Sequence, residues 1–441
     1  MAGVHDDAVA IAPEVIALRR AIHADPEIGT DLPRTQRKVL AALDGLPLEI
    51  TCGRALTSVT AVLRGARHSA ANHDAANHGA ANRGSANNGA ANNGAANDGA
   101  AHHSPASSAG PTVLLRGDMD ALPVAERTGV PYASHVPGVM HACGHDLHTA
   151  MLAGAARLLA ARQAELAGDV IFMFQPGEEG FGGARLMIDE GVLDAAGDRP
   201  VAAYGMHVAS GLLPLGLWTG RPGPMMAAAD TLEVTVRGRG GHASQPHRSA
   251  DPIPVACEIV TALQTLVTRK FDVFDPVVIT VGSFHAGTTD NVIPDEARFS
   301  ATVRSFSPQA RTAIQAASAR LIRELASAHG LSATAEFVAG YPVTVNDATE
   351  LAFAEQTVGE SLGEGRFYLA PNPVTGSEDF SFVLEEVPGA FIMLGACPPD
   401  ADAATAPFNH SAEAVFDDAI VADGVTVYAE LALRRLAQAA G

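Results

Sequence analysis

Short apolar strands alternate with longer amphipathic helices along most of the 441 residues, and this alternation limits the folds that the chain can adopt. Strands are predicted at 113–115, 170–174, 201–206 and 390–394, and helices at 8–23, 147–165 and 418–437. Strands that are separated by helices indicate a mixed, mostly parallel sheet sandwiched by helices, which places the chain in the α/β class.

A different order of elements interrupts this alternation between residues 230 and 338. The predicted order is a strand at 232–236, a helix beginning near Pro252, strands at 277–284 and 297–306, a helix at 308–329 and a strand at 332–338. This β-α-β-β-α-β order is typical of a ferredoxin-like α+β unit. We therefore predict two domains, one formed by residues 1–223 and 347–441 and the other by the inserted residues 224–346.

A low-complexity segment, at about residues 67–110, differs from both patterns. From Ala70 to about Ser104 it repeats a unit close to Ala-Ala-Asn-x-Gly and contains no large apolar side chain. Such a segment cannot bury enough apolar surface to offset the entropy cost of ordering, so we predict a disordered insertion. Its histidines fit a solvated linker better than a metal site. Because strand-like residues flank it at 58–64 and 112–116, we expect it to extend a hairpin turn.

The composition argues against several classes of protein. A formal net charge of −20 disfavours a nucleic-acid or anionic-membrane partner, because binding phosphates requires clustered Lys and Arg. The four cysteines are too few for a disulfide scaffold and fit a reducing compartment. The N-terminal residues show no secretory signal pattern, and no apolar stretch approaches the length of a membrane span. We therefore expect a soluble, cytoplasmic protein.

Two pairs of acidic residues follow predicted strands. Asp118 and Asp120 come directly after the first strand, at the edge where parallel sheets bind ligands, and either ligate a metal, orient a ligand or cap a turn. Glu178 and Glu179 follow the strand at 170–174 and are flanked by glycines. Adjacent side chains point in different directions, so one glutamate can ligate a metal while the other acts as a base, as a hydrolase requires. The alternative is a solvated acidic turn.

A dense cluster of metal-binding side chains occurs in His141-Ala-Cys-Gly-His-Asp-Leu-His148, at the start of a predicted helix. Cys143 and His145 can reach one metal because Gly144 permits a tight backbone between them. Asp146 is predicted to hold a ligand imidazole in its correct tautomer. The alternative is a buried structural thiol with surface histidines, and a structural zinc site would need a second Cys/His pair.

Two single histidines, His207 and His410, carry less information. His207 ends a strand-like segment and His410 lies in Phe408-Asn-His-Ser411. A lone histidine is more often a core or surface residue than a ligand, so their importance depends on the other clusters.

The motifs occur in an ordered run that is highly specific. The run consists of Gly-Asp-Met-Asp-Ala-Leu-Pro, Cys-Gly-His-Asp, Pro-Gly-Glu-Glu-Gly, Gly-Met-His, Gly-Gly-His-Ala-Ser, Asp-Asn-Val-Ile-Pro and Asn-His-Ser. It resembles the metallo-amidohydrolases that include hippurate hydrolase, N-acyl-amino-acid amidohydrolases and auxin-conjugate hydrolases, within the aminoacylase/carboxypeptidase superfamily. The resemblance extends from Arg20 to the C-terminus, apart from the low-complexity segment. It implies a catalytic domain like that of zinc peptidases and hydrolysis of N-acyl amino acids to a carboxylate and a free amino acid.

The resemblance also implies a site with two divalent metal ions. Its ligands would be Cys143, His145, Glu179, His207 and His410, with the Cys143 thiolate bridging the ions. One ion would be bound by the two earlier histidines and the other by the glutamate and the last histidine. Glu178 would be the general base that activates water and then protonates the leaving amine. The mixed donor set is compatible with Zn, Mn, Co or Ni.

Other implied roles lie in and near the inserted unit, which resembles a lid and dimerisation domain. His242 would stabilise the tetrahedral oxyanion, often across a dimer interface, so a homodimer or homotetramer is expected. Asn291 and Arg304 resemble residues near the substrate carboxylate, and Gly376 resembles a residue that lines the pocket.

One departure from the wider superfamily narrows the class of enzyme. Peptidase members carry a His-x-Asp motif after the strand, whereas this chain has Asp118-Met-Asp120. This difference favours the amidohydrolases over dipeptidases. Two alternatives are kept: a dipeptidase or aminopeptidase, and a catalytically inactive metal-binding homologue, which the intact Glu178 and ligand set argue against.

Overall fold

The computed structural model describes residues 3–65 and 110–441 and contains two sheets of different construction. The predicted insertion at 67–110 lies almost entirely outside the described residues. The larger sheet has eight strands in the order β1-β2-β4-β3-β5-β16-β6-β15. Its strands are β1 (Leu48–Cys52), β2 (Val59–Leu63), β3 (Thr112–Asp118), β4 (Asp169–Gln175), β5 (Ala202–Ala209), β6 (Trp218–Gly220), β15 (Phe367–Leu369) and β16 (Gly389–Gly395).

The central strands β4, β3, β5 and β16 are parallel and buried on both faces, as predicted. Every residue of β3 and β4 is buried, and alternate side chains of β3 point into different cores: Val113 and Leu115 on one face, Leu114 on the other. This burial explains why these strands are apolar at successive positions rather than at every second one.

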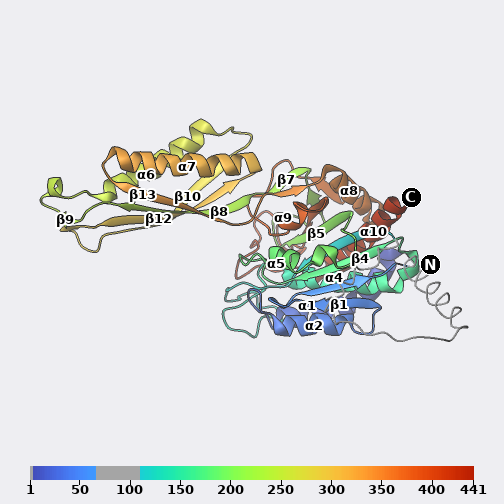
Figure 1. The fold of residues 1–441 in the computed structure, drawn as a ribbon. Coiled ribbons are helices and arrows are strands. Elements are labelled where there is room, and N and C mark those ends of the chain that lie inside the picture. Colours follow the sequence, from blue (N-terminus) through green and yellow to red (C-terminus); the bar gives the residue numbers. More distant parts are fainter. Residues whose placement is uncertain (1–2, 66–109) are drawn as a thin grey trace, which may run out of the picture.

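Helices cover both faces of the larger sheet (Figure 1). Three that contact one another, α1 (Val4–His23), α4 (His145–Ala161) and α10 (Val421–Ala440), cover one face together with α2 (Pro33–Leu43) and α8 (Ala348–Leu362). The short helices α5 (Gly183–Asp189) and α9 (Ser381–Leu384) lie on the other face. None of the helices within the described ranges is both long enough and apolar enough to cross a lipid bilayer.

The smaller sheet is antiparallel, with the strand order β10-β12-β8-β13. Its elements are β8 (Ala228–Arg237), α6 (Pro252–Lys270), β10 (Val277–Ala286), β12 (Glu296–Ser305), α7 (Pro308–Ala328) and β13 (Ser332–Ala339). Burial alternates along β8 and β12 because α6 and α7 cover only one face of this sheet. The β-α-β-β-α-β prediction therefore agrees with the observed elements.

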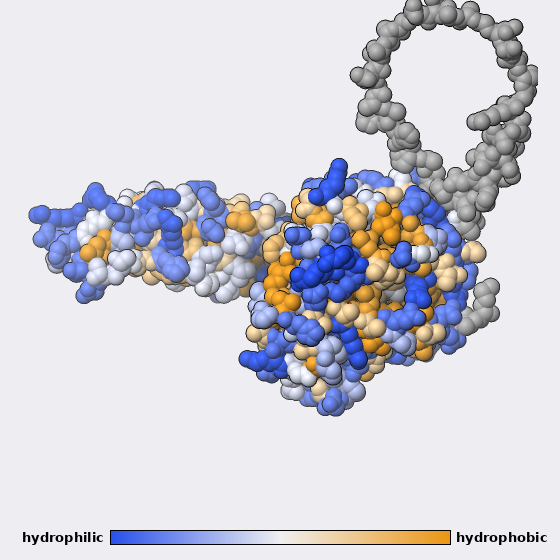
Figure 2. Space-filling model, turned by 90° about the horizontal axis from the view of Figure 1, so that it is seen from below, coloured by the Kyte–Doolittle hydropathy of each residue, from blue (hydrophilic) through white to orange (hydrophobic). Residues whose placement is uncertain are grey.

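The smaller unit projects from the larger one as an arm, and we call it the lid (Figure 1). In the view of Figure 2, hydrophilic residues dominate the lid, while hydrophobic residues gather on the larger unit. The chain passes between the two units twice, once into the lid and once back. At these two crossings, β7 (Gly223–Met226) pairs with β14 (Thr344–Asn346). We propose the predicted domain boundaries, after residues 223 and 346, because the chain passes between the two units at this ribbon.

At the far end of the lid, a short ribbon is formed by β9 (Gly241–His242) and β11 (Val292–Ile293) (Figure 1). The single-turn helices η1 (Gln163–Glu165), η2 (Val192–Asp194), η3 (Pro246–Arg248) and η4 (Asp418–Ile420) complete the described elements.

Two predictions about local structure are wrong. The strands that flank the insertion do not form a hairpin, because β4 lies between β2 and β3 and pairs with both. The helix predicted at 147–165 begins two residues earlier, directly after the left-handed Gly144, and ends at Ala161 before the separate turn η1. A hydrophobic pattern does not report either the strand order or a helix start that is set by one backbone angle.

Candidate metal centre

Cys143 and His145 are placed by a sharp turn at the N-terminus of α4. Gly144 between them has a φ of 84°, and a Cβ atom there would lie 2.3 Å from a methyl group of Val208. A residue with a side chain could therefore not replace it without moving the end of β5. The turn directs the thiol and the imidazole into one buried region, where His145 is fully inaccessible to solvent.

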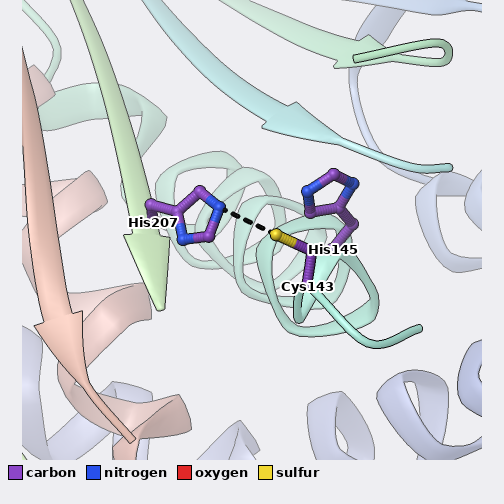
Figure 3. A group of neighbouring side chains, drawn as sticks. All are labelled: Cys143, His145 and His207. Atoms are coloured by element: carbon purple, nitrogen blue, oxygen red, sulfur yellow. Dashed lines mark hydrogen bonds between the residues drawn. The ribbon is translucent and has the colours of Figure 1, made fainter. Parts of the chain in front are cut away.

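His207 reaches the same region from β5, and its ring faces the Cys143 thiol (Figure 3). Its Nε2 atom lies 3.3 Å from Sγ of Cys143, and its Nδ1 atom lies 2.8 Å from the carbonyl oxygen of Val208. Burial lowers the pKa of His207 well below its ordinary value, and the neighbouring His148 lowers it further. A neutral ring that donates through Nδ1 leaves Nε2 available as a ligand atom.

Glu179 and His410 also lie close to the thiol. The Nε2 atom of His410 lies 3.3 Å from Sγ of Cys143 and 3.2 Å from Oε1 of Glu179. These two contacts raise the pKa of His410 to about 10. His410 has a φ of 73°, a left-handed conformation that is unfavourable for a residue with a side chain and that often occurs at functional sites.

Asp120 shapes the turn that carries the two glutamates. Its carboxylate oxygens accept hydrogen bonds from the backbone N–H groups of Glu178, at 2.9 Å, and Glu179, at 3.0 Å. Of the roles left open for this residue, these bonds support turn capping, and its Oδ1 atom also lies 3.5 Å from Nδ1 of the predicted ligand His145.

Asp118 and His148 form a buried hydrogen-bonded pair next to the ligand cluster. The Nδ1 atom of His148 lies 2.6 Å from Asp118, and Nε2 accepts a hydrogen bond of 2.8 Å from the N–H of Val208. Both ring nitrogens of His148 are thus in use, so this histidine is not free to ligate a metal. Asp118 also contacts Arg116, at 2.6 Å.

The five predicted ligands fit a site for two metal ions. Cys143 belongs to two groups of donors, one with His145 and His207 and one with Glu179 and His410, and within each group the donor atoms lie within 4.8 Å of one another. Both ring nitrogens of His145 are buried: Nδ1 lies 3.5 Å from Asp120 and Nε2 lies 3.6 Å from Asp118, and neither makes a hydrogen bond within the described residues. Buried imidazole nitrogens without partners are costly unless a ligand satisfies them.

The two adjacent glutamates have different electrostatic environments. Burial raises the pKa of Glu178 well above its ordinary value, and the carboxylates of Glu378 and Glu179 raise it further. For Glu179, burial also favours a higher pKa, but the contact with His410 and the charge of His145 outweigh it and lower the pKa. A protonatable carboxylate beside an ionised one is the arrangement expected for a proton-transferring residue next to a metal ligand.

A cavity of about 600 Å³ opens onto the cluster. Glu178, Arg304 and Gly376 line it, so these predicted site residues lie together with the ligand cluster. Arg304 belongs to the lid strand β12, and its Nη1 atom is buried without a hydrogen-bond partner among the described residues. The apolar part of the wall comes from Met226, Val374, Met393 and Phe408.

His242 and Asn291 lie elsewhere, on the ribbon at the far end of the lid (Figure 1). Both are exposed, and the N–H of Ala243 donates to the carbonyl oxygen of Asn291, at 3.1 Å. Neither lines the cavity. Asn291 therefore lies beside His242 and not beside Arg304, with which the sequence motifs had grouped it.

The predicted role of Asp146 is wrong. Its Oδ2 atom lies 2.8 Å from Nδ1 of His23 and 2.7 Å from Nε of Arg19, and neither residue belongs to the ligand cluster. Asp146 is on the side of α4 that packs against α1, away from the cluster. For His207, the backbone carbonyl of Val208 orients the ring instead.

Two residues near the site were not predicted from the sequence. The Asn409 side chain donates to the carbonyl oxygens of Cys143, at 3.2 Å, and Val208, at 2.9 Å, and so joins the two segments that carry ligands. Its position beside His410 was the available signal. Tyr341 lines the cavity from the connection between lid and sheet, and no local pattern marks it.

Comparison with known proteins identifies the family. A family model described as peptidase family M20/M25/M40 matches residues 114–434. The chain belongs to this family.

Individual M20/M25/M40 relatives match nearly the whole chain. Thermostable carboxypeptidase 2 from Saccharolobus solfataricus is 32% identical over 433 residues, 97% of this chain and 97% of the relative. IAA-amino acid hydrolase ILR1-like 4 from Arabidopsis thaliana is 33% identical over 426 residues, 96% of this chain and 86% of the relative. The crystal structure of the Bacillus subtilis YXEP protein, described as a dinuclear metal binding peptidase from the M20 family, is 30% identical with a TM-score of 0.76, covering 97% of this chain and 99% of that chain.

Membership of the M20/M25/M40 family confirms the predicted class of enzyme, a hydrolase that acts on carbon–nitrogen bonds. It also confirms the resemblance to the amidohydrolases that was drawn from the ordered motifs.

Proposed function

We propose that this M20-family hydrolase cleaves the amide bond of N-acyl amino acids and releases a carboxylic acid and a free amino acid. The observation that carries the proposal is the joint position on one cavity of Glu178, the thiol-centred ligand cluster and Arg304, whose Nη1 atom has no hydrogen-bond partner among the described residues. A base, a metal site and a cation for the substrate carboxylate are the three elements that this reaction requires.

Two divalent cations would be held by the shared thiolate, one with His145 and His207 and the other with Glu179 and His410. When bound, such ions polarise the amide carbonyl and lower the pKa of water. The metal is expected to be Zn, Mn, Co or Ni, since all four accept mixed sulfur, nitrogen and oxygen donors.

Glu178 would carry the proton through the reaction. In its ionised form it accepts a proton from the attacking water, whose oxygen forms a bond to the acyl carbon. When the carbon–nitrogen bond breaks, the same carboxyl group delivers that proton to the leaving amine. The buried position of Glu178 supports this role, because burial raises the pKa of its carboxyl group and so favours the protonated form that delivers the proton.

Substrate orientation would come from both units. Arg304 would bind the carboxylate of the amino-acid part, since a guanidinium can donate two parallel hydrogen bonds to such a group. The apolar wall formed by Met226, Val374, Met393 and Phe408 would contact the acyl part. Gly376 would leave room there, because a Cβ atom at this position would lie 3.2 Å from the end of Met226.

A second copy of the chain would supply His242 and Asn291. Their exposed position at the far end of the lid keeps them out of the cavity of their own chain. In a homodimer or homotetramer, a lid of one copy could place His242 over the cavity of another, where it would stabilise the oxyanion.

The test compares the wild type and the Glu178→Gln variant on a panel of substrates. We expect the wild type to hydrolyse N-acetyl, N-benzoyl or indole-acetyl amino acids faster than unblocked dipeptides. The substitution Glu178→Gln should lower kcat by about 10²–10⁴-fold and leave the bound metal unchanged. Faster cleavage of dipeptides would favour a peptidase, in line with the name of the carboxypeptidase relative. A fully active, metal-loaded Glu178→Gln variant would exclude Glu178 as the base.

A further inference from the structure

The connection that leads from the lid back to the larger sheet carries a side chain that reaches the catalytic turn. Tyr341 lies between β13 and β14, and its hydroxyl donates a hydrogen bond of 2.5 Å to the carbonyl oxygen of Glu178. The same hydroxyl accepts a hydrogen bond of 3.1 Å from the N–H of Gly182. One phenol therefore spans the turn that contains both glutamates.

The turn needs such side-chain hydrogen bonds to keep a single conformation. Gly177, Gly180 and Gly182 all have positive φ angles, of 76°, 88° and 67°, and glycine backbones are the most flexible in the unrestrained chain. Asp120 holds the start of the turn through two N–H groups. Tyr341 holds its far part at Gly182 and also donates to the Glu178 carbonyl, while the Asp379 carboxylate accepts a hydrogen bond of 2.9 Å from the N–H of Ala184, just beyond the turn.

The backbone around Tyr341 is anchored to the lid. The N–H of Gly340 donates to Asp230, at 3.1 Å, and Arg311 of α7 binds the same carboxylate through two bonds of 2.8 and 2.6 Å. The carbonyl oxygen of Tyr341 accepts a hydrogen bond of 3.0 Å from the N–H of Ala229, at the start of the lid strand β8. Gly340 packs tightly against the start of β8, since a Cβ atom on Gly340 would lie 2.1 Å from the carbonyl oxygen of Ala229.

We infer that Tyr341 is a positioning residue: it fixes the Glu178–Glu179 turn and ties its geometry to the lid. The inference deepens the proposed function and rests on it, because it assumes that Glu178 transfers the proton. A lid that moves relative to the larger sheet would displace Tyr341 and, through its hydroxyl, the base. The ring itself packs edge-on against Phe382, with centroids 6.1 Å apart, so the hydroxyl can be removed while the packing is retained.

The test is the substitution Tyr341→Phe in the metal-loaded full chain, with N-benzoylglycine or whichever N-acyl amino acid the wild type cleaves fastest as substrate. We expect kcat to fall by about tenfold, the effect of losing one or two hydrogen bonds, while KM changes little and the metal content stays full. Hydrogen–deuterium exchange of a peptide covering residues 176–183 should become faster, because the Gly182 amide loses its acceptor. Tyr368→Phe, at an exposed tyrosine on β15, is the matched control and should alter neither quantity.

Each outcome has a distinct meaning. Faster exchange together with a lower kcat supports the inference. Unchanged exchange would show that Tyr341 does not hold the turn, and faster exchange with an unchanged kcat would show that the turn does not need it; either result overturns the inference. Failure of the proposed function is recognised separately, by full activity of Glu178→Gln, a variant that leaves Tyr341 intact.

Discussion

The centre of the larger sheet and the far end of the lid both carry residues that the sequence motifs mark as functional, but their surroundings differ. His145 is buried, and His207 is held by the carbonyl of Val208. His242 at the lid end is exposed, and its Nδ1 contacts only the neighbouring Ser244, at 2.9 Å, among the described residues. Side chains that are buried in their own chain, or held by its hydrogen bonds, are preorganised within that chain. An exposed histidine on a projecting arm acquires a defined environment only when another surface covers it.

The largest expected effect concerns the buried centre. Cys143→Ala removes the donor shared by both ligand groups, so we expect loss of both metal ions and a fall in activity of more than about 10³-fold. Elemental analysis of the purified protein and steady-state kinetics measure the two effects. Cys257→Ala, at an exposed cysteine on α6 of the lid, should leave both unchanged. Full metal content in Cys143→Ala would rule out the bridging thiolate.

The second prediction tests whether the lid end acts on another copy. His242→Ala should lower kcat by about 10²–10³-fold without loss of metal, the usual effect of removing an oxyanion donor. If His242 acts across an interface, mixing His242→Ala with Glu178→Gln should restore activity, to roughly a quarter of the wild-type value in randomly mixed dimers.

The matched control for that experiment is a mixture of Cys143→Ala and Glu178→Gln. Both substitutions damage the same buried centre, so no hybrid dimer contains an intact site and activity should stay low. Restoration in this control, or its absence in the first mixture, would contradict the proposed contribution from a second chain.

The third prediction concerns Arg304, a charged lid residue that lines the cavity of its own chain. Loss of its charged hydrogen bonds to a substrate carboxylate should lower kcat/KM by about 10- to 100-fold in Arg304→Ala, mainly through KM. Arg298→Ala, on the same strand but exposed and paired with Glu296, is the control. Equal losses in the two variants would argue against a carboxylate site at Arg304.

The smallest expected effect is on the pH dependence of stability. Burial alone would lower the pKa of His23, but the Asp146 carboxylate and a hydrogen bond to it outweigh burial and raise the pKa to about 9. A raised folded-state pKa contributes stability that is fully present below about 6.5, the pKa in the unfolded chain, and is lost as pH rises through about 9.

We therefore expect the free energy of unfolding of the wild type to fall between about pH 6.5 and 9 more steeply than that of His23→Gln. Urea denaturation at several pH values measures the difference. An identical slope in the two proteins would show that His23 is not charged in the folded state.

Much of the fold follows from local patterns in the chain. Continuous apolar runs such as 170–174 indicate strands buried on both faces, and the β-α-β-β-α-β order between residues 230 and 338 indicates a separate antiparallel unit. The order of strands is not local, which explains why β2 and β3 were wrongly expected to form a hairpin.

For the candidate site as well, local motifs predict some residues, while other contacts depend on tertiary packing. Short motifs at strand ends and at a helix start identify Glu178, Cys143 and His145, because parallel strands carry these positions to one edge of the sheet. The direction in which Asp146 points depends on which side of α4 contacts α1, and no local pattern contains that information.

The α/β class, the inserted unit and the donor-rich motifs can be read from the chain alone, since each depends on periodicity or on residues close together in sequence. Which distant residues meet becomes clear in the folded molecule: Arg304 and Tyr341 join Glu178, while His242 and Asn291 remain at the end of the lid. Such contacts are set by the packing of whole elements and link residues more than a hundred positions apart, such as Tyr341 and Glu178.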